Sequence, residues 1–201
     1  VLAARDEIDR LENILSLYRP GSALTRLNET SAIDPAPLEL MEVLRHSLWY
    51  TDITGGAFDV SIQPLWELYA HHFGNPGRDG DGPDPRAIGD ALSRVGAHRI
   101  HRTSTGIVLA PGTRLTFNGI AQGYITDRVA DLLRGRGWRN VLLDLGEFHA
   151  LGDRADGRPW KVQLPGGGHL DMAEGALATS SADGLRFSAK AHHIFDPRTG
   201  T

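Results

Sequence analysis

The amino-acid sequence predicts an α+β fold, with helices concentrated in the first half of the chain and short strands in the second. Apolar residues recur at helical spacing through the first half. The second half contains short apolar runs separated by turns rich in Gly and Pro. One amphipathic helix, which begins near residue 121, stands among these strands.

Helices account for most of the chain before residue 96. The apolar spacing predicts helices over residues 1–18, 37–51, 61–69 and 84–95. The apolar faces of the first two are expected to include Leu2, Ile8, Leu11, Ile14, Leu15, Tyr18, Leu38, Met41, Leu44, Leu48 and Trp49. Ser22 is expected to cap a short turn through Asn28, and Asp84 to cap the last of these helices. The Gly/Asp/Pro-rich stretch 74–85 is expected to be a loop.

Strands are expected where short apolar runs lie between turn residues. These runs cover residues 98–102, 106–110, 114–117, 141–145, 148–151, 159–162, 175–179 and 192–195. Residues 152–158 and 165–168 are the turns between some of them.

Composition excludes several functional classes. The 201 residues carry a net charge of −4, and Lys and Arg do not cluster into a basic stripe, which argues against a nucleic-acid partner. The chain contains no cysteine, which excludes a disulfide scaffold, a Cys-ligated metal and a thiol nucleophile. No apolar run is long enough to span a bilayer.

The stretch Leu115–Gly137 is the most informative part of the chain. It reads as a short strand, a tight glycine-containing turn and a helix. Backbone N–H groups at a helix start, together with the helix dipole, favour an anion such as a phosphate. Taken alone, the same pattern also fits an ordinary strand-to-helix connection.

Two further turns carry groups that can contact a ligand. Gly56 allows close approach of a flat ligand to the backbone just before Asp59. A helix C-cap followed by an N-cap at Asp59 fits these residues equally well. Residues 178–181 form a small hydroxyl cluster that suits a phosphate or a ring nitrogen, and that also suits a simple turn or cap.

Acidic and histidine side chains give two candidate metal or ribose sites. Asp144 and Glu147 flank a glycine turn, where they can bind a metal or a ribose hydroxyl, or can simply end a β-hairpin. His192, His193 and Asp196 form a conceivable metal set. Neighbouring residues of a strand point in opposite directions, which argues against both histidines binding one ion.

Six segments of the chain are specific in combination. They are Ser16–Asn28, Gly55–Trp66, Thr116–Leu133, Val141–Gly152, Leu177–Ser181 and His192–Gly200. Together they resemble the ApbE family of flavin transferases (FAD:protein FMN transferases). The N-G-I-A-Q-G-Y form and the D-L-G-E turn are most similar to the branch of the NosX-type maturation proteins of nitrous oxide respiration. The resemblance implies an ApbE-like (T-fold-like) mixed sheet with packed helices.

This resemblance also implies an activity. Members of the family split FAD and attach its FMN half, through a phosphoester, to a Thr or Ser hydroxyl of a target protein, and they require Mg²⁺. Their targets are typically subunits of membrane redox complexes, such as the Na⁺-pumping quinone reductase (Nqr), the Rnf complex or NosR. We therefore expect FAD and such a subunit as partners, and a periplasmic location or a membrane anchor facing the periplasm.

Site residues follow from the resemblance position by position, and none of them is assigned as catalytic. The positions that match FAD-contacting or flavin-pocket positions are Ala57, Phe58, Asp59, Thr116, Gln122, Ser180 and His193. The turn at Asn118 and Gly119 is the expected place of phosphate neutralisation, and the backbone carbonyl of Gly119 matches a metal-ligand position.

The chain departs from the commoner family form D-L-G-G-I-A-K-G-Y. Thr116 replaces an acid, Asn118 a small residue, and Gln122 a Lys or Glu. A cation lost at Gln122 weakens phosphate neutralisation by about 1–3 kcal/mol if that contact is direct. We also expect residues 1–201 to be one incomplete domain, without the family's first strand and with the remaining metal ligands beyond Thr201.

Three other functions are compatible with the sequence. Thr116 and Gln122 favour a flavin-binding carrier that holds FAD without transferring it. An FAD pyrophosphatase that releases FMN and AMP to water uses the same cleavage with another acceptor. An unrelated α+β interaction domain is the remaining alternative.

Overall fold

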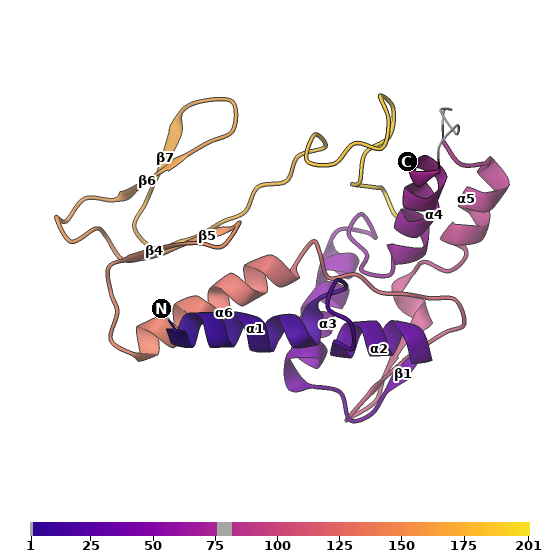
Figure 1. Cartoon of the computed structure of the whole chain (residues 1–201), viewed down its shortest axis with the longest axis horizontal. Coiled ribbons are helices and arrows are strands. Elements are labelled where there is room, and N and C mark those ends of the chain that lie inside the picture. Colours follow the sequence, from indigo (N-terminus) through magenta and orange to yellow (C-terminus); the bar gives the residue numbers. More distant parts are fainter. Residues whose placement is uncertain (1, 76–81) are drawn as a thin grey trace. The chain divides into compact units, whose positions relative to one another are not determined.

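The chain divides into two compact units, each built from two separate stretches. The computed structural model describes residues 2–75 and 82–201, so residues 76–81 of the loop expected at 74–85 lie outside the described residues. One unit holds the residues up to Leu11 together with Ile120–Thr179, and the other holds Glu12–Gly119 together with Ser180–Thr201. Figure 1 labels their elements along the chain. The expectation of one domain over residues 1–201 stays a prediction.

Helices dominate the unit formed by Glu12–Gly119 and Ser180–Thr201, which we call the helical unit. Its elements are α2 (Ala23–Thr30), α3 (Leu38–Ile53), α4 (Gln63–Gly74), α5 (Pro85–Leu92) and a short 3₁₀ helix (Ala97–Arg99), and α1 (Leu2–Leu15) ends within it. Both expected caps are confirmed, because Ser22 Oγ accepts from the Thr25 N–H and Asp84 Oδ1 accepts from the Arg86 N–H, at 3.0 and 2.7 Å. The turn expected after Ser22 is a helix of 8 residues.

Some apolar side chains that the helical spacing places on buried faces are in fact exposed. Leu2 and Leu38 are the first residues of α1 and α3, and they are 78% and 84% exposed. The predicted helix 1–18 ends at Leu15, so helical spacing does not apply to Tyr18, which is 73% exposed. Trp49, near the end of α3, is also exposed. No helix of the described ranges is both long enough and apolar enough to cross a bilayer.

A small antiparallel sheet completes the helical unit. Its strands are β1 (Ala32–Ile33), β2 (Ile100–Arg102) and β3 (Ile107–Leu109), in the order β1-β3-β2. The sequence predicts β2 and β3 but not β1, because a strand of 2 residues is too short to show an alternating pattern.

The strand expected at 114–117 is not formed. Arg114 makes only an isolated bridge with Ile62. The backbone of Leu115 is instead held by the buried side chain of Asn28, whose Nδ2 donates to the Leu115 carbonyl at 2.8 Å and whose Oδ1 accepts from the Leu115 N–H at 2.7 Å. A side chain from α2 therefore takes the backbone groups that a neighbouring strand would otherwise use.

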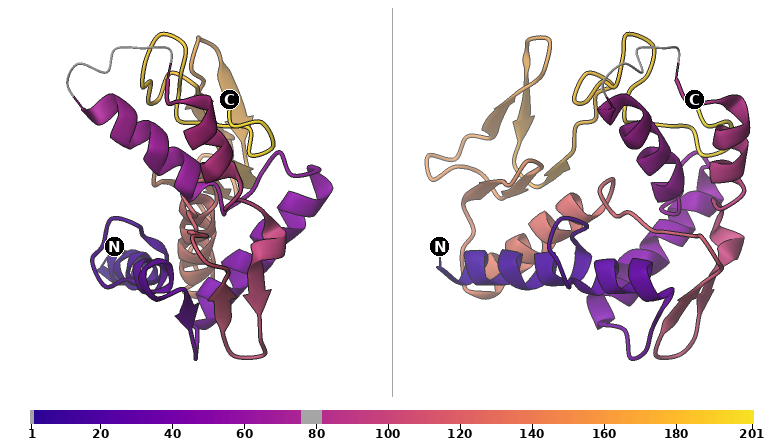
Figure 2. Two further views of the ribbon diagram at one scale, coloured as in Figure 1. Left: turned by 90° about the vertical axis from the view of Figure 1, so that its right-hand side faces the viewer. Right: turned by 45° about the vertical axis from the view of Figure 1, so that its right-hand side comes forward.

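An aromatic core lies where α4 and α5 pack side by side and the C-terminal segment runs beside them (Figures 1 and 2). Its centre is Tyr69, whose ring lies 4.6 Å from that of Phe195 and whose hydroxyl donates to the Gly200 carbonyl at 3.1 Å. Burial raises the pKa of Tyr69. The strand expected at 192–195 is wrong, because this segment makes only an isolated bridge from His192. Packing of side chains, rather than a strand ladder, holds it in place.

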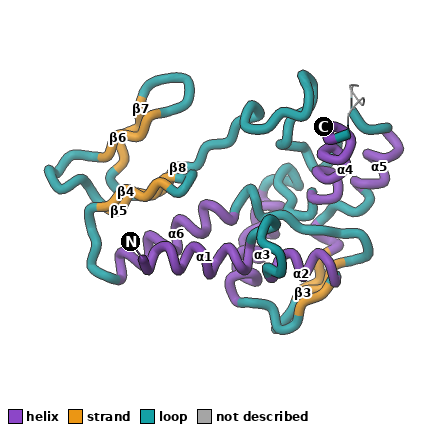
Figure 3. The backbone as a smooth tube through the Cα atoms, in the orientation of Figure 1, coloured by secondary structure: helices purple, strands orange, loops and turns teal. Residues whose placement is uncertain are grey.

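The other unit, which we call the α6 unit, holds α1 as far as Leu11 and packs a further helix against strands. Its elements are α6 (Ala121–Gly135), β4 (Val141–Asp144), β5 (Phe148–Leu151), β6 (Trp160–Gln163), β7 (His169–Met172) and β8 (Gly175–Leu177). The strand order β4-β5-β8 and the separate β6-β7 hairpin can be followed in Figure 3. All named strands of the described residues pair antiparallel, in three small sheets, and this mixture of helices and small sheets agrees with the α+β class predicted from the sequence.

Candidate functional site

The helical unit brings together two of the segments that the sequence singles out. A Cβ placed on Gly119 would lie 3.3 Å from Cε2 of Phe58, so the ring of Phe58 packs directly on that glycine. The Thr116 N–H donates to the Val60 carbonyl at 2.8 Å, which ties the two segments through their backbones. Phe58 is half-buried, and its ring also meets the edge of Tyr50. The predicted residues 57–59 and 116–119 are therefore neighbours.

The turn before Phe58 depends on glycine. Gly55 and Gly56 adopt φ values of +58° and +81°, which residues other than glycine rarely adopt. The turn closes on Thr54, whose Oγ1 accepts from the Phe58 N–H at 3.1 Å. These residues end α3 as the capping interpretation predicts and leave Phe58 pointing at Gly119.

Asp59 is buried and serves the local fold. Its Oδ1 accepts from both the N–H and the hydroxyl of Ser61, at 2.8 and 2.7 Å. The Ser61 hydroxyl oxygen accepts in turn from the Gly96 N–H. Asp59 is not the N-cap of α4, which is Ile62, so its role is to hold the chain between the two helices. Ala57, between the two glycines and Phe58, is exposed.

The turn at 116–119 is tied to a residue that sequence reasoning missed. The Asn118 N–H donates to Thr116 Oγ1 at 3.2 Å, and Asn118 Nδ2 donates to the Tyr18 hydroxyl at 2.9 Å. Tyr18 is exposed and lies just after α1. Tyr18 lies in the segment Ser16–Asn28, one of the six that resemble the family, and this could have marked it as a site residue. Helical periodicity instead predicts that it lies on a buried face.

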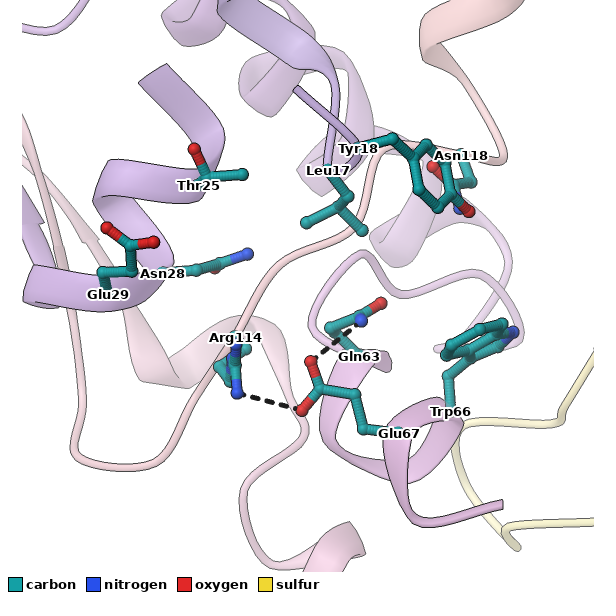
Figure 4. Close-up of a pocket in the computed structure, with 10 residues that line it drawn as sticks. All are labelled: Leu17, Tyr18, Thr25, Asn28, Glu29, Gln63, Trp66, Glu67, Arg114 and Asn118. Carbon is teal, nitrogen blue, oxygen red and sulfur yellow. Dashed lines mark hydrogen bonds and ion pairs between the residues drawn. The ribbon is translucent and has the colours of Figure 1, made fainter. Parts of the chain in front are cut away.

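A pocket of about 260 Å³ opens beside this turn (Figure 4). Its lining combines aromatic, amide and charged side chains: Leu17, Tyr18, Thr25, Asn28, Glu29, Gln63, Trp66, Glu67, Arg114 and Asn118. Glu67 accepts from Gln63 Nε2 at 3.0 Å and pairs with Arg114 Nη1 at 3.1 Å. A planar, polar ring system suits such walls. The sequence pattern gave no signal for this pocket, because its lining comes from several separate elements.

The start of α6 leaves backbone donors uncapped. The junction between the two units falls inside the predicted anion-binding turn, after Gly119. Ile120 occupies the N-cap position without a side-chain cap, and the first helical hydrogen bond runs from the Tyr124 N–H to the Ile120 carbonyl. The N–H groups of residues 121–123 precede that bond, and such groups favour an anion.

Gln122 has a structural partner within the α6 unit. Its Nε2 donates to the Leu145 carbonyl at 2.8 Å. A Cβ on Gly146 would overlap the same amide, so the β4–β5 turn closes tightly over Gln122. The position that commonly carries a cation in the family therefore holds a neutral amide that clamps this turn.

The hairpin interpretation of Asp144 and Glu147 is confirmed. Asp144 pairs with Phe148 at the end of the β4–β5 ladder, and its Oδ1 accepts from the Gly146 N–H at 3.3 Å. Glu147 Oε2 accepts from the Thr179 N–H at 3.1 Å. Asp144 thus stabilises the turn itself, and Glu147 ties the turn to the chain just after β8.

Of the two predicted residues in the C-terminal segment, His193 has a hydrogen-bond partner within the segment and Ser180 is exposed. His193 Nδ1 lies 3.0 Å from the Leu185 carbonyl, so this nitrogen carries the proton and donates. Ser180 is exposed. The metal set considered for His192, His193 and Asp196 is wrong, since the described residues contain no group of three or more such side chains able to hold a metal.

The same finding bears on Mg²⁺. The backbone carbonyl of Gly119 is a single oxygen donor, and the described residues do not surround it with a set of carboxylates. The donors present among the described residues therefore do not fit a complete Mg²⁺ site.

The protein has an α+β fold, and its candidate site combines a glycine-dependent turn, an aromatic ring near that turn and a polar pocket. Such a combination suits a nucleotide-like ligand. The chain belongs to the ApbE family, whose family model matches residues 2–201. It is similar to the solved flavin transferase ApbE from Vibrio cholerae, with 26% identity, a TM-score of 0.78 and coverage of 99% of this chain and 69% of the other.

Curated relatives point the same way. The chain is 29% identical to FAD:protein FMN transferases from Vibrio cholerae and from Treponema pallidum, over 96% and 100% of its own length. It spans 63% and 64% of the lengths of these two relatives. Membership of the family confirms the predicted ApbE-like fold. The assignment to the NosX-type branch and the individual site residues stay predictions.

Proposed function

We propose that this chain belongs to an FAD:protein FMN transferase. The observation that carries the proposal is the packing of Phe58 on Gly119, which joins the two segments that the family resemblance assigns to the flavin. Membership of the ApbE family and the names of the curated relatives support it.

Each part of the site has a role in this proposal. The Phe58 ring offers an aromatic surface for a flat ligand at the glycine turn. The pocket beside Tyr18 and Asn118 accepts one of the ring systems of FAD. In the reaction, a hydroxyl oxygen of the target protein forms a new bond to the phosphorus of FMN while the bond to AMP breaks.

The finer parts of the proposal follow the resemblance. They are Mg²⁺ dependence, a Thr or Ser acceptor, a phosphoester link, a target subunit of the NosR, Rnf or Nqr kind, and a location on the periplasmic side of the membrane. Mg²⁺, when bound, neutralises phosphate charge. In this proposal the residues of this chain bind and orient the flavin nucleotide.

One assay tests the proposal. The full-length protein is incubated with FAD, Mg²⁺ and an acceptor protein, and flavin fluorescence is read on a denaturing gel. Fluorescence that stays with the acceptor is the expected result, and it disappears with EDTA or when the acceptor Thr or Ser is replaced by Ala. Release of free FMN without labelling of the acceptor would contradict transfer and indicate FAD hydrolysis. FAD that stays intact and bound would contradict transfer and indicate a carrier.

A further inference from the structure

One arginine of the C-terminal segment lies directly on the glycine turn of the candidate site. A Cβ placed on Gly56 would lie 3.7 and 3.8 Å from Cγ and Cδ of Arg198, and no other described side chain comes within 4 Å of it. Both residues belong to the helical unit. The aliphatic stem of Arg198 therefore covers the backbone just before Phe58.

Its guanidinium is held at one edge and free at the other. Arg198 Nε and Nη2 donate to Asp196 Oδ1 and Oδ2 at 2.8 and 2.6 Å, and the Arg198 N–H also donates to Asp196 Oδ1. A guanidinium has five N–H donors, so three remain without a partner among the described residues. The side chain is 54% exposed. This geometry fixes the plane of the fork and leaves donors facing solvent beside the turn.

The cation that lines the pocket of the helical unit is less suited to this role. Arg114, at the pocket, is already paired with Glu67. A phosphate at the 55–59 turn would therefore meet Arg198, whose stem lies on that turn, as a positive charge with N–H donors still to give.

We propose that Arg198 binds a phosphate of the flavin nucleotide, using the donors that Asp196 leaves free. This inference rests on the proposed function and adds a residue to it. Arginine suits the role because its planar fork can give two parallel hydrogen bonds to phosphate oxygens. The exposed ion pair with Asp196 holds the fork in advance, so less side-chain freedom is lost on binding.

Flavins that differ only in their phosphates test this role. Binding of FAD, FMN and riboflavin to the full-length protein is measured by fluorescence for the wild type, Arg198→Gln and Arg198→Lys. Arg186→Gln is the matched control, because Arg186 pairs with Asp183 in the same C-terminal segment in the same exposed manner. We expect Arg198→Gln to weaken FMN and FAD binding roughly tenfold and to leave riboflavin binding unchanged. Arg198→Lys should retain part of the affinity, and Arg186→Gln all of it.

Salt dependence gives a second reading. Affinity of the wild type for FMN should fall as ionic strength rises, and that slope should be shallower in Arg198→Gln. Equal FMN affinity in the wild type and Arg198→Gln would overturn the inference. A loss of riboflavin affinity as large as the loss of FMN affinity would also overturn it, because it would show a purely structural role of Arg198. A wild type that binds none of the three flavins would instead overturn the proposed function, and this inference with it.

Discussion

Asn28 should be one of the most sensitive positions in the helical unit. Asn28 is 9% exposed, and its amide makes two hydrogen bonds to the backbone of Leu115, at 2.8 and 2.7 Å. Replacement by Ala leaves a buried N–H and a buried carbonyl without partners. It also frees the chain that leads into Thr116 and Gly119, because that segment is not part of a strand ladder.

The size of the effect follows from those two bonds. An orphaned buried backbone group costs about 1–3 kcal/mol, and partial access of water to the small cavity lowers the upper limit. We therefore expect Asn28→Ala to lower the free energy of unfolding by about 2–4 kcal/mol. For a chain of this length that corresponds to a drop in Tm of roughly 5–15 °C.

Thermal and urea unfolding, followed by circular dichroism, measure this loss. Asn140→Ala is the matched control, because Asn140 is exposed and makes a single hydrogen bond, to the Asp153 carbonyl. The control should change the stability by less than about 0.5 kcal/mol. If Asn28→Ala were no more destabilising than Asn140→Ala, the explanation of how Leu115 is held would be refuted.

Two further predictions concern the turns. Gly152→Ala should destabilise the protein by about 2–4 kcal/mol, because φ at Gly152 is +64° and the added Cβ would meet the Arg139 carbonyl. Gly157→Ala is the control, because φ is +76° but the space around the added Cβ is open, and it should cost only about 1–2 kcal/mol. Equal losses of stability in urea unfolding would contradict this prediction. The hydrogen bonds from Arg198 lower the pKa of Asp196 to about 2, so the stability that this carboxylate contributes should be present above about pH 4 and be lost as the pH falls through 2. Carboxyl NMR should show that midpoint in the wild type and a higher one in Arg198→Gln, which loses the side-chain donors but keeps the backbone N–H, and an unchanged midpoint in the variant would refute the assigned cause.

Local signals in the sequence predicted most of the helices and both expected caps, whereas α2 was expected only as a short turn. Ser22 and Asp84 cap helices because their side chains reach amides only two or three residues away, and such short-range pairs are visible in the sequence. The α6 helix was likewise predicted from its apolar spacing, and the hairpin at Asp144 and Glu147 from its glycine turn.

Long-range contacts explain what the sequence did not reveal. The strand expected at 114–117 is absent because Asn28, far away in the chain, takes the backbone groups of Leu115. The contact of Arg198 with Gly56 and the hydrogen bond of Tyr18 with Asn118 join segments that no periodicity relates. The strand β7 was missed because its only partner is β6 and its residues show no clear alternation of apolar and polar side chains.

The central claim is that the turns around Phe58 and Gly119 form one flavin-binding site. The most direct test is a titration of the full-length protein with FAD, comparing the wild type, Phe58→Ala and Trp138→Ala. Trp138 is the control, because it is an aromatic side chain that is 56% exposed in the α6 unit. We predict that Phe58→Ala weakens FAD binding about tenfold and that Trp138→Ala leaves it unchanged. Wild-type affinity for FAD in Phe58→Ala would contradict the claim.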